Sequence, residues 1–457
     1  MTVIPQKRKK GASVLKQSTY DHPFGIKPMG NSYFDSSNGI KECKSHGLSV
    51  FNVLPEQQLL ELLIYLGPEA AAKLAQTSRA FYVYCYHDDL WRQFTIKRFN
   101  GDFEFIINWR NTFKSKYQKY IQDSPIKIQG FYSDLLYTAW RCVSVPLKDL
   151  CGVENDNIDR RSNMTLEAFI QEYMIPNKPV ILTDVVQNWP AYKKWNFEYL
   201  LGTDFKFRAE AVDITFANYY KYMTQCKEEA PLYLFDKKCT FDEKMRNDFQ
   251  IPDYFNQDLF SVLKEKRPDY RWLIVGPERS GSTFHIDPNS TNAWNAVIKG
   301  SKKWILYPPN HIPPGVYPSR DGSEVTSPVS LAEWFLNYYQ DIQDDPIEQR
   351  PVEAVCKEGE ILFVPNKWWH CVMNLEPGIA LTQNFVGMEN LESVLNFCKK
   401  KPEQVSGFCH GDLYEEFKKG LQQDMPQVWD KVKHLDQASA KETWNNLCME
   451  KSFSFSF

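Results

Sequence analysis

Histidine is scarce in this sequence, and long apolar runs are missing. Only eight histidines occur among 457 residues. No apolar run approaches the roughly 18 residues that a bilayer span needs, so we expect no membrane segment. The N-terminus lacks the apolar core of a signal peptide, which argues against secretion. The formal net charge of −3 gives no global attraction to nucleic acid or membranes and leaves nucleic-acid binding undecided.

Paired cysteines are missing as well. The eleven cysteines are odd in number, and none forms a Cys-x-x-Cys pair. This pattern indicates reduced intracellular thiols and argues against a disulfide framework. Apolar and aromatic residues, in contrast, are plentiful at 43% and 15%. The sequence therefore predicts packed cores that are rich in sheet.

Two of the few histidines fall in strand-like stretches. His285 and Asp287 are separated by one residue, so in an extended strand both side chains leave the same face. A second apolar run, residues 359–364, ends at Pro365 and leads to His370. A His-x-Asp pair alone is more often a surface or core pair than a ligand set. Two histidines and one carboxylate together form the facial triad of non-heme Fe(II) oxygenases.

Residues 291–308 read as a β-hairpin with its turn at Gly300. Alternation puts Lys302 on one face with Trp304 and Leu306, toward the interior, and Lys303 on the other. A buried ammonium needs an anion, and a dicarboxylate cosubstrate would supply it. We expect Lys303 to contribute far less to binding. Three more polar residues on strands are candidates for the same pocket, although each is also consistent with an ordinary turn or edge position: Asn295, Thr382 and Asn384.

These motifs, in order, resemble a Jumonji-C domain. They are His285-Ile-Asp287, Trp294-Asn295, Gly300-x-Lys302-x-Trp304, Phe363-x-Pro365 through His370, and Thr382-x-Asn384-Phe385. The stretch from Tyr270 to Gly281 is similar to the phosphatidylserine-receptor-like group, which contains the bifunctional arginine demethylase and lysyl hydroxylase. The resemblance covers roughly residues 130–400. It implies an α+β fold with a double-stranded β-helix.

The resemblance also implies cofactors and roles. Fe(II) would bind His285, Asp287 and His370, and 2-oxoglutarate would pair with Lys302. Ser282 stands where the family has a threonine that holds the cosubstrate, with Thr283 as the alternative hydroxyl. The resemblance also implies that Tyr233 lines the cosubstrate or substrate pocket. The implied reaction is hydroxylation or N-methyl demethylation of a protein side chain, for example in a histone or a splicing or RNA-binding protein.

Residues 48–100 form a separate leucine-rich helical segment. Leu54-Pro55 begins a helix, Gly67-Pro68 ends it, and a Leu-Trp-Arg triplet follows at residues 90–92. The segment resembles an F-box, which docks on Skp1 in ubiquitin ligases. We expect Leu54, Pro55 and Leu59 to lie on the docking face. A helical cap on the catalytic domain is the structural alternative. The functional alternative for the whole chain is an adaptor of an SCF-type ubiquitin ligase, in which the β-helix mainly binds.

The remaining segments complete the expected domain plan. Residues 1–47 read as a disordered basic tail. Their cluster at residues 7–10 is consistent with nuclear import, with the cytoplasm as a second location, or with a solvated charge run. Residues 101–130 read as a helical linker, 131–390 as the catalytic domain and 391–457 as a helical region. Relatives dimerise through such C-terminal helices, and the insertion at 309–358 is expected to form a substrate wall.

Overall fold

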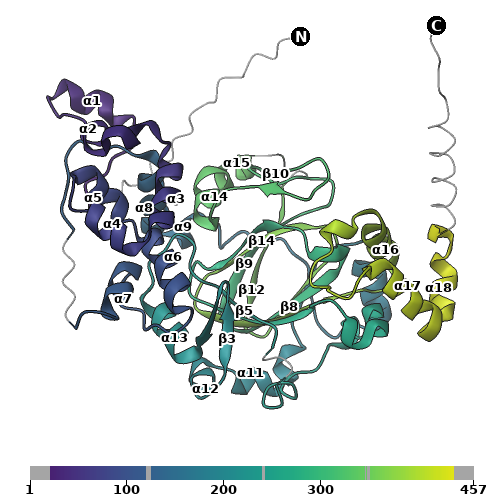
Figure 1. The fold of residues 1–457 in the computed structure, drawn as a ribbon. Coiled ribbons are helices and arrows are strands. Elements are labelled where there is room, and N and C mark those ends of the chain that lie inside the picture. The colour runs from purple at the N-terminus through teal and green to yellow at the C-terminus, as the bar shows by residue number, and fades with distance from the viewer. Residues whose placement is uncertain (1–20, 120–124, 239–241, 345, 347–349, 437–457) are drawn as a thin grey trace, which may run out of the picture. The chain divides into compact units, whose positions relative to one another are not determined.

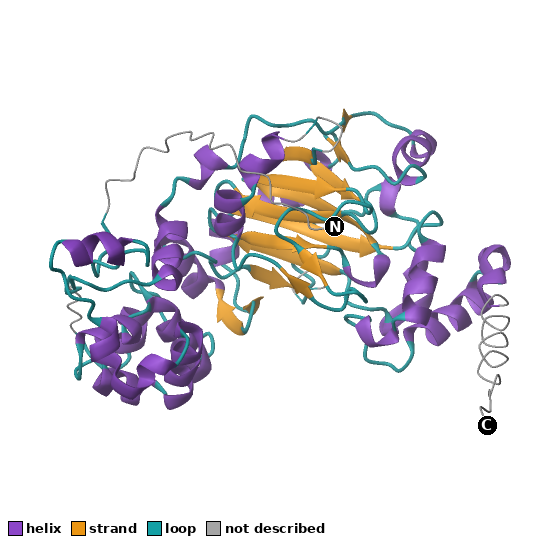
Figure 2. Ribbon diagram, turned by 90° about the horizontal axis from the view of Figure 1, so that it is seen from above, coloured by secondary structure: helices purple, strands orange, loops and turns teal. Residues whose placement is uncertain are grey.

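The computed structural model describes residues 21–119, 125–238, 242–344, 346 and 350–436 (Figure 1). They divide into two compact units, residues 21–94 with 125–146, and residues 95–119 with the described part of 147–436. The first unit is helical and the second contains the sheets (Figure 2). Across the described ranges, no helix has the length and apolar character to cross a membrane.

The first unit is built from short helices around a leucine and aromatic core. Ser78 caps α5 by accepting a hydrogen bond from the Phe81 amide, as N-cap serines do. The Glu56 carboxylate accepts bonds from Lys44, Tyr84 and Ser133, which ties three segments of the unit together. The elements are α1 (Asn31–Ser37), α2 (Lys44–Leu48), η1 (Ser49–Val53), α3 (Glu56–Leu66), α4 (Pro68–Leu74), α5 (Arg79–Cys85), the start of α6 (Asp88–Phe99) and α8 (Asp134–Ser144).

Two sequence expectations about this region are wrong. Residues 21–47 are not a disordered tail, because they contain α1 and α2. Lys27 pairs with Asp35 at 2.8 Å, and Tyr132 donates to the same carboxylate at 2.9 Å. Leu59 is not on a docking face, because it is only 1% exposed and belongs to the unit's own core. Residues 1–20, which hold the basic cluster, lie outside the described residues.

The second unit confirms the expected double-stranded β-helix. Its four-stranded sheet has the order β12-β9-β14-β7. The nine-stranded sheet has the order β1-β2-β13-β8-β15-β6-β5-β3-β4. The strands that enclose the core are β6 (Arg271–Gly276), β7 (Gly281–His285), β8 (Asn292–Lys299), β9 (Ser301–Tyr307), β12 (Val352–Lys357), β13 (Ile361–Val364), β14 (Trp369–Asn374) and β15 (Gly378–Phe385). The outer strands are β1 (Arg160–Arg161), β2 (Val180–Leu182), β3 (Lys206–Ala209), β4 (Val212–Thr215) and β5 (Leu234–Asp236).

Inward-facing side chains from both sheets form one apolar cluster, which includes Val297, Trp304 and Val372. Strands β8 and β9 have the predicted positions, but they are not a hairpin. β8 pairs with β13 and β15, whereas β9 pairs with β12 and β14. Gly300, at a φ of 81°, therefore turns the chain from one sheet to the other. The predicted inward face of Lys302 survives, because alternation along a strand is independent of its pairing partner.

Helices surround the sheets. The insertion after β9 carries β10 (Tyr317–Pro318), β11 (Val325–Thr326), α14 (Leu331–Asn337) and α15 (Tyr339–Asp344). Residues 101–130 are not a helical linker, since within their described part only α7 (Trp109–Ser115) is an α-helix and residues 101–119 belong to the second unit. The α-helices between residues 147 and 225 are α9 (Leu147–Leu150), α10 (Leu166–Phe169), α11 (Pro190–Lys194), α12 (Phe197–Leu201) and α13 (Phe216–Gln225).

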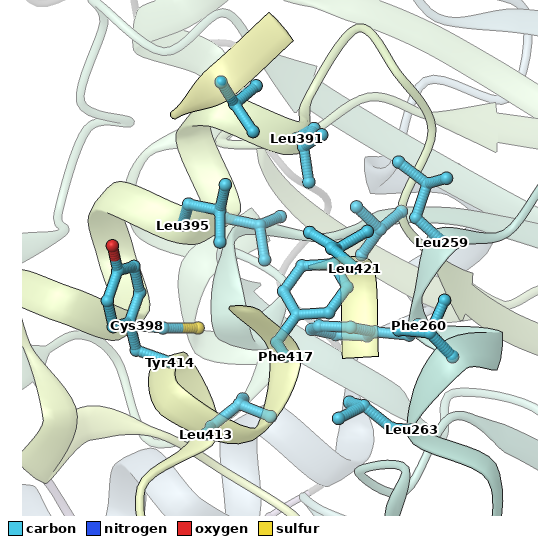
Figure 3. Close-up of a cluster of buried hydrophobic side chains, with 14 of the residues drawn as sticks. Leu259, Phe260, Leu263, Leu391, Leu395, Cys398, Leu413, Tyr414, Phe417 and Leu421 are labelled. Atoms are coloured by element: carbon cyan, nitrogen blue, oxygen red, sulfur yellow. The ribbon is translucent and has the colours of Figure 1, made fainter. Parts of the chain in front are cut away.

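The C-terminal helices pack within the second unit. They are α16 (Leu391–Lys400), α17 (Leu413–Asp424) and α18 (Pro426–Val432), and their apolar faces meet η6 (Leu259–Lys266). Figure 3 shows Phe417 of α17 beside Phe260 of η6, and their ring centroids are 4.7 Å apart. Residues 437–457 of the expected helical region lie outside the described residues.

Candidate functional site

His285, Asp287 and His370 converge at one point. Their potential ligand atoms all lie within 4.8 Å of one another. His370 Nε2 is 4.0 Å from Asp287 Oδ1, and the two imidazole centroids are 4.2 Å apart. The two histidines are direct partners in the β7–β14 pair, so both side chains leave the same face of the sheet. Asp287 follows the end of β7 and returns its carboxylate to that face.

Both imidazoles are held in the orientation that a metal ligand needs. His285 Nδ1 donates to the Thr283 carbonyl at 2.7 Å, and His370 Nδ1 donates to the Trp368 carbonyl at 3.0 Å. Each Nε2 therefore carries a lone pair that is free to bind a cation. Burial and the neighbouring His285 hold the pKa of His370 well below its usual range, so its ring is neutral.

A β-bulge in β7 brings Ser282 to the same side as the histidines. His285 pairs with His370, and Ser282 pairs with Val372. The step between these two pairs is three residues along β7 and only two along β14, so β7 contains one extra residue. Without the extra residue, positions three apart would face opposite ways. Ser282 therefore shares the inner face of Val372, and register favours it over Thr283 as the hydroxyl that faces the interior.

Lys302 and Tyr233 meet inside the β-helix. Lys302 is 2% exposed, and its Nζ donates to the Tyr233 hydroxyl at 2.7 Å. Among the described residues, no carboxylate pairs with this ammonium. Burial lowers the pKa of Lys302 to about 7.

Lys303 lies on the opposite face, as the sequence predicted. It is buried there and paired with Glu353 at 2.7 Å. It also donates to the carbonyls of Gly152 and Asn155. Lys303 is thus part of the fold and an unsuitable neutral control for Lys302.

The remaining predicted residues line the same interior. Asn295 and Thr382 are direct partners on β8 and β15. The Asn384 amide donates to Thr291 Oγ1 at 2.8 Å and lies close enough to Asp287 to lower the pKa of its carboxyl, which burial raises. The structure therefore brings together the predicted triad, Ser282, Lys302, Tyr233 and these three polar residues.

Unsatisfied polar atoms test whether this interior fits a metal and a dicarboxylate. Asp287 Oδ2, Asn295 Oδ1 and Trp304 Nε1 are buried without a hydrogen-bond partner. Such groups are rare in a protein unless a ligand, ion or water completes them. A carboxylate and two imidazole Nε2 atoms suit a ferrous ion, and the buried Lys302 ammonium suits a carboxylate. The donor set thus fits both groups.

A pocket of about 390 Å³ opens beside the triad. His285 and Ser282 form part of its wall. Two carboxylates also face the pocket: Glu210 lies between β3 and β4, and Glu229 follows α13. Glu210 accepts from the Tyr233 amide at 3.3 Å, and Glu229 accepts from the Ser330 hydroxyl at 2.7 Å. The insertion contributes to the wall, as expected. The lining residues are Glu210, Glu229–Pro231, Arg279–Thr283, His285 and Val329–Leu331.

Sequence reasoning missed Glu210, Glu229 and Asn374. The two glutamates lie outside any motif, and their convergence depends on the tertiary fold. Asn374 was within reach, because residues 370, 372 and 374 alternate inward along β14.

Comparisons with known proteins agree with this geometry. A family model described as a cupin-like domain matches residues 165–389, and one described as F-box-like matches residues 51–97. The chain is similar to the arginine-specific demethylase JMJ22 of Arabidopsis thaliana, with 41% identity over 98% of this chain and 91% of that protein.

Two further relatives match a smaller part of the chain. The bifunctional arginine demethylase and lysyl-hydroxylase psr-1 of Caenorhabditis elegans is 34% identical over 62% of this chain and 72% of that protein. The 2-oxoglutarate and iron-dependent oxygenase JMJD4 of Gallus gallus is 28% identical over 50% of this chain and 60% of that protein.

Proposed function

Because the chain belongs to the Jumonji-C family of iron- and 2-oxoglutarate-dependent oxygenases and carries an F-box-like domain, we propose that it oxidises a cationic side chain of a protein. In this proposal, His285, Asp287 and His370 hold Fe(II). Lys302 and Tyr233 hold the distal carboxylate of 2-oxoglutarate, with the other inward polar residues around it: Ser282, Asn295, Thr382 and Asn384.

The bound iron and cosubstrate supply the activation of dioxygen and the oxidation of a C–H bond. The chain's own residues orient the reactants. The carbonyls of Thr283 and Trp368 fix the two imidazoles. The apolar cluster around Trp304 and Val372 keeps water from the interior, which strengthens the pairing of Lys302 with a carboxylate. Oxidation of a chain carbon gives a hydroxylated residue, and oxidation of an N-methyl carbon ends in demethylation.

The single observation that carries the substrate proposal is the pocket beside His285. Two carboxylates, Glu210 and Glu229, and one guanidinium, Arg279, line a space next to the triad, so the charged groups of this wall carry a net charge of −1. A lysine or arginine side chain, methylated or not, offers a cation with N–H donors to such groups. Two relatives, an arginine-specific demethylase and a bifunctional arginine demethylase and lysyl-hydroxylase, support this class of substrate. Histones and splicing or RNA-binding proteins present such side chains.

Mass spectrometry of basic peptides tests the proposal. Peptides with arginine, lysine and their methylated forms would be incubated with the enzyme, Fe(II) and 2-oxoglutarate. A gain of one oxygen indicates hydroxylation, and a loss of CH₂ indicates demethylation. We expect Glu210→Gln and Glu229→Gln to raise the KM for these peptides about ten-fold or more, since each removes one charge-assisted bond.

Glu278→Gln is the matched control, because Glu278 is an exposed glutamate of the adjacent loop that is not part of the pocket wall. Its KM should stay at the wild-type value. Equal turnover of peptides in which acetyl-lysine or citrulline replaces the cation would refute the selection of charge.

The F-box-like domain supports a second proposal, docking on Skp1. The large apolar residues that the first unit exposes within residues 51–94 are Val53, Tyr65 and Leu66. Of the predicted docking residues, Pro55 is exposed and Leu54 is half-buried. Val53→Asp and Tyr65→Asp should abolish co-purification with recombinant Skp1. Ile126→Asp, at an exposed aliphatic position of the same unit outside residues 51–97, is the control. Wild-type protein that fails to bind Skp1 would refute this docking. An SCF-type adaptor role and oxidation are compatible on one chain, although a pure adaptor has no use for a complete triad.

Nuclear localisation and dimerisation stay proposals. The basic cluster at residues 7–10 supports nuclear import, and alanine replacement of the cluster should shift a fluorescent fusion toward the cytoplasm. Homodimerisation through the C-terminal helices would use surfaces other than their apolar faces, because these pack against η6 in the same chain. Sedimentation equilibrium measures this association.

A further inference from the structure

Asp287 differs from the two histidines of the triad in how its backbone is held. His285 and His370 are direct partners in the β7–β14 pair, so the sheet fixes both. Asp287 lies beyond the end of β7, at the start of the turn η7 (Pro288–Ser290) that leads to β8. A functional side chain must stay within about 0.5 Å of its productive place, so contacts outside the sheet must hold this turn.

The turn after Asp287 has an unusual backbone. Asn289 and Ser290 are consecutive and both left-handed, with φ values of 56° and 58°. Residues other than glycine rarely adopt this conformation, although asparagine tolerates it better than serine. The Thr291 hydroxyl closes the turn from within by donating to the Pro288 carbonyl at 2.9 Å. Two strained residues in succession persist only where their surroundings hold them.

The C-terminal region holds Asn289 by two hydrogen bonds. The Asn289 side chain is buried, donates to the Ser406 carbonyl at 2.9 Å and accepts from the Ser406 amide at 2.9 Å. A backbone amide only donates and a carbonyl only accepts, so the pair of bonds allows one orientation of the side chain. Ser406 lies between η9 (Pro402–Gln404) and α17. The turn is thus tied to a segment 117 positions away.

Helix α16 holds the next residue of the turn, Ser290. Its hydroxyl lies 3.0 Å from the Ser393 hydroxyl, and its carbonyl accepts from the Asn390 side chain at 3.2 Å. Asn390 is 1% exposed, and its Oδ1 accepts from the Gly387 amide at 2.8 Å and from the Asn292 side chain at 3.1 Å. The apolar face of α16 packs on η6, so the helix is a firm support for the turn.

We propose that Asn289 is a positioning residue for the metal and that residues 390–406 support the metal centre through it. The bonds to Ser406, Ser393 and Asn390 hold the left-handed turn, and the turn holds the Asp287 carboxylate beside the two imidazoles. The C-terminal helices thus contribute to metal binding as well as to packing. This inference rests on the proposed binding of Fe(II) by the triad.

Titration of Mn(II) into metal-free protein tests this role by binding rather than by activity. Loss of a contact that orients a ligand costs about 10–100-fold in metal affinity, and we expect about thirty-fold for Asn289→Ala. Asn289→Gly should cost about ten-fold, because glycine relieves the backbone strain but loses both bonds. Ser393→Ala, which removes one bond, should cost about three-fold. The absorption spectrum of bound Co(II) should change in both Asn289 variants, since it reports the ligand geometry.

Asn100→Ala is the matched control. Asn100 is also left-handed, with a φ of 52°, and its side chain accepts from the Asp213 amide at 3.4 Å. Asp213 belongs to β4, the outermost strand of the nine-stranded sheet. Asn100→Ala should lower the melting temperature, as Asn289→Ala should, because alanine is strained in a left-handed conformation. Its Mn(II) affinity and Co(II) spectrum should nevertheless be those of the wild type.

Several outcomes would overturn the inference. Asn289→Gly with wild-type Mn(II) affinity would show that the side-chain bonds position nothing. Equal losses of affinity in Asn289→Ala and Asn100→Ala would reduce Asn289 to a contribution to general stability. If Asn289→Ala does not fold, the glycine variant still decides, because glycine adopts the left-handed backbone without strain. Wild-type protein that does not bind Mn(II) would instead refute the metal site and the proposed function.

Discussion

Lys302 and Lys303 are neighbours in β9, and each is almost completely buried, at 2% and 1% exposure. Their surroundings are opposite in kind. Lys303 has a carboxylate and two carbonyls around its ammonium, all at 2.7 Å. Lys302 has one phenol. An ammonium carries three donors, so Lys303 is complete within the chain and Lys302 is not. The buried charge of Lys303 is thus part of the fold, whereas the ammonium of Lys302 has donors left over for a ligand.

The largest effect should follow the loss of Lys303. Lys303→Met leaves the buried Glu353 carboxylate without its counter-charge, and breaking such a pair destabilises a protein by about 3–5 kcal/mol. Urea denaturation measures the free energy of unfolding. Lys303→Met/Glu353→Leu should recover much of it, since both charges are then absent.

Lys299→Met is the matched control for that experiment. Lys299 also pairs with a glutamate, Glu358 at 2.7 Å, but both side chains are partly exposed. Its loss should change the free energy of unfolding by less than about 1 kcal/mol. A similar effect at positions 299 and 303 would remove the distinction between a surface pair and a structural one.

Lys302→Met should leave the fold intact and remove cosubstrate binding. The variant loses the charge that pairs with the distal carboxylate, so we expect the affinity for 2-oxoglutarate to fall by about a hundred-fold or more. Mn(II) binding should persist, because Lys302 is not a ligand of the triad. Calorimetric titration of metal and then of cosubstrate measures both. Unchanged cosubstrate affinity would mean that the inward lysine serves another anion.

The pH dependence of cosubstrate binding sharpens the contrast. Burial lowers the pKa of Lys302 to about 7, and a bound carboxylate favours the charged form. Above about pH 7, binding must therefore take up a proton, and affinity should fall by about ten-fold per pH unit. Below that pH the Lys302 contribution should be flat. Lys302→Met should lack this slope, and a wild-type affinity that stays constant from pH 7 to 9 would contradict the explanation.

The smallest effect concerns stability without cosubstrate. The pKa of Lys302 is lowered on folding, so the unfolded chain binds more protons between pH 7 and the ordinary value of 10.5. The Lys302 contribution to the free energy of unfolding therefore rises with pH across that window and is least favourable below pH 7. Lys302→Met should stabilise the protein by about 1 kcal/mol at pH 6. Thermal denaturation at pH 6 and pH 9 measures the difference, and a variant that is less stable than wild type at pH 6 would count against it.

Alternation along strands carried most of the site prediction. It placed Lys302 inward, because this depends only on local geometry. The His-x-Asp motif was expected within one strand, but β7 ends at His285 and Asp287 lies beyond it. Pairing is not local, and the sequence wrongly joined β8 and β9 as a hairpin. The bulge that turns Ser282 inward is visible only against Val372, which lies 90 positions away. The partners of Lys303 are also distant in sequence, Gly152 by 151 positions and Glu353 by 50.

In the first unit the limitation was of another kind. Helical periodicity shows that α3 has an apolar side, and it cannot say which leucines that side buries within the unit and which it offers to a partner. The structure places Leu59 in the core and leaves Tyr65 outside. Residues 21–47 were misjudged because a few polar contacts, such as Lys27 with Asp35, order a segment with little periodicity.

The insertion between β9 and β12 joins two strands that are direct neighbours in one sheet. The two strands pair from Ser301 with Lys357 to Leu306 with Val352, and this pairing does not depend on the residues of the insertion between them. Loop-closure entropy grows only slowly with length, so this segment can lengthen or shorten at little energetic expense. The part of the pocket wall at Val329–Leu331 therefore lies on a loop that can be replaced without disturbing the sheet. Evolution, or an engineer, can graft a different loop there to redirect the enzyme to new targets while the cofactor centre stays untouched.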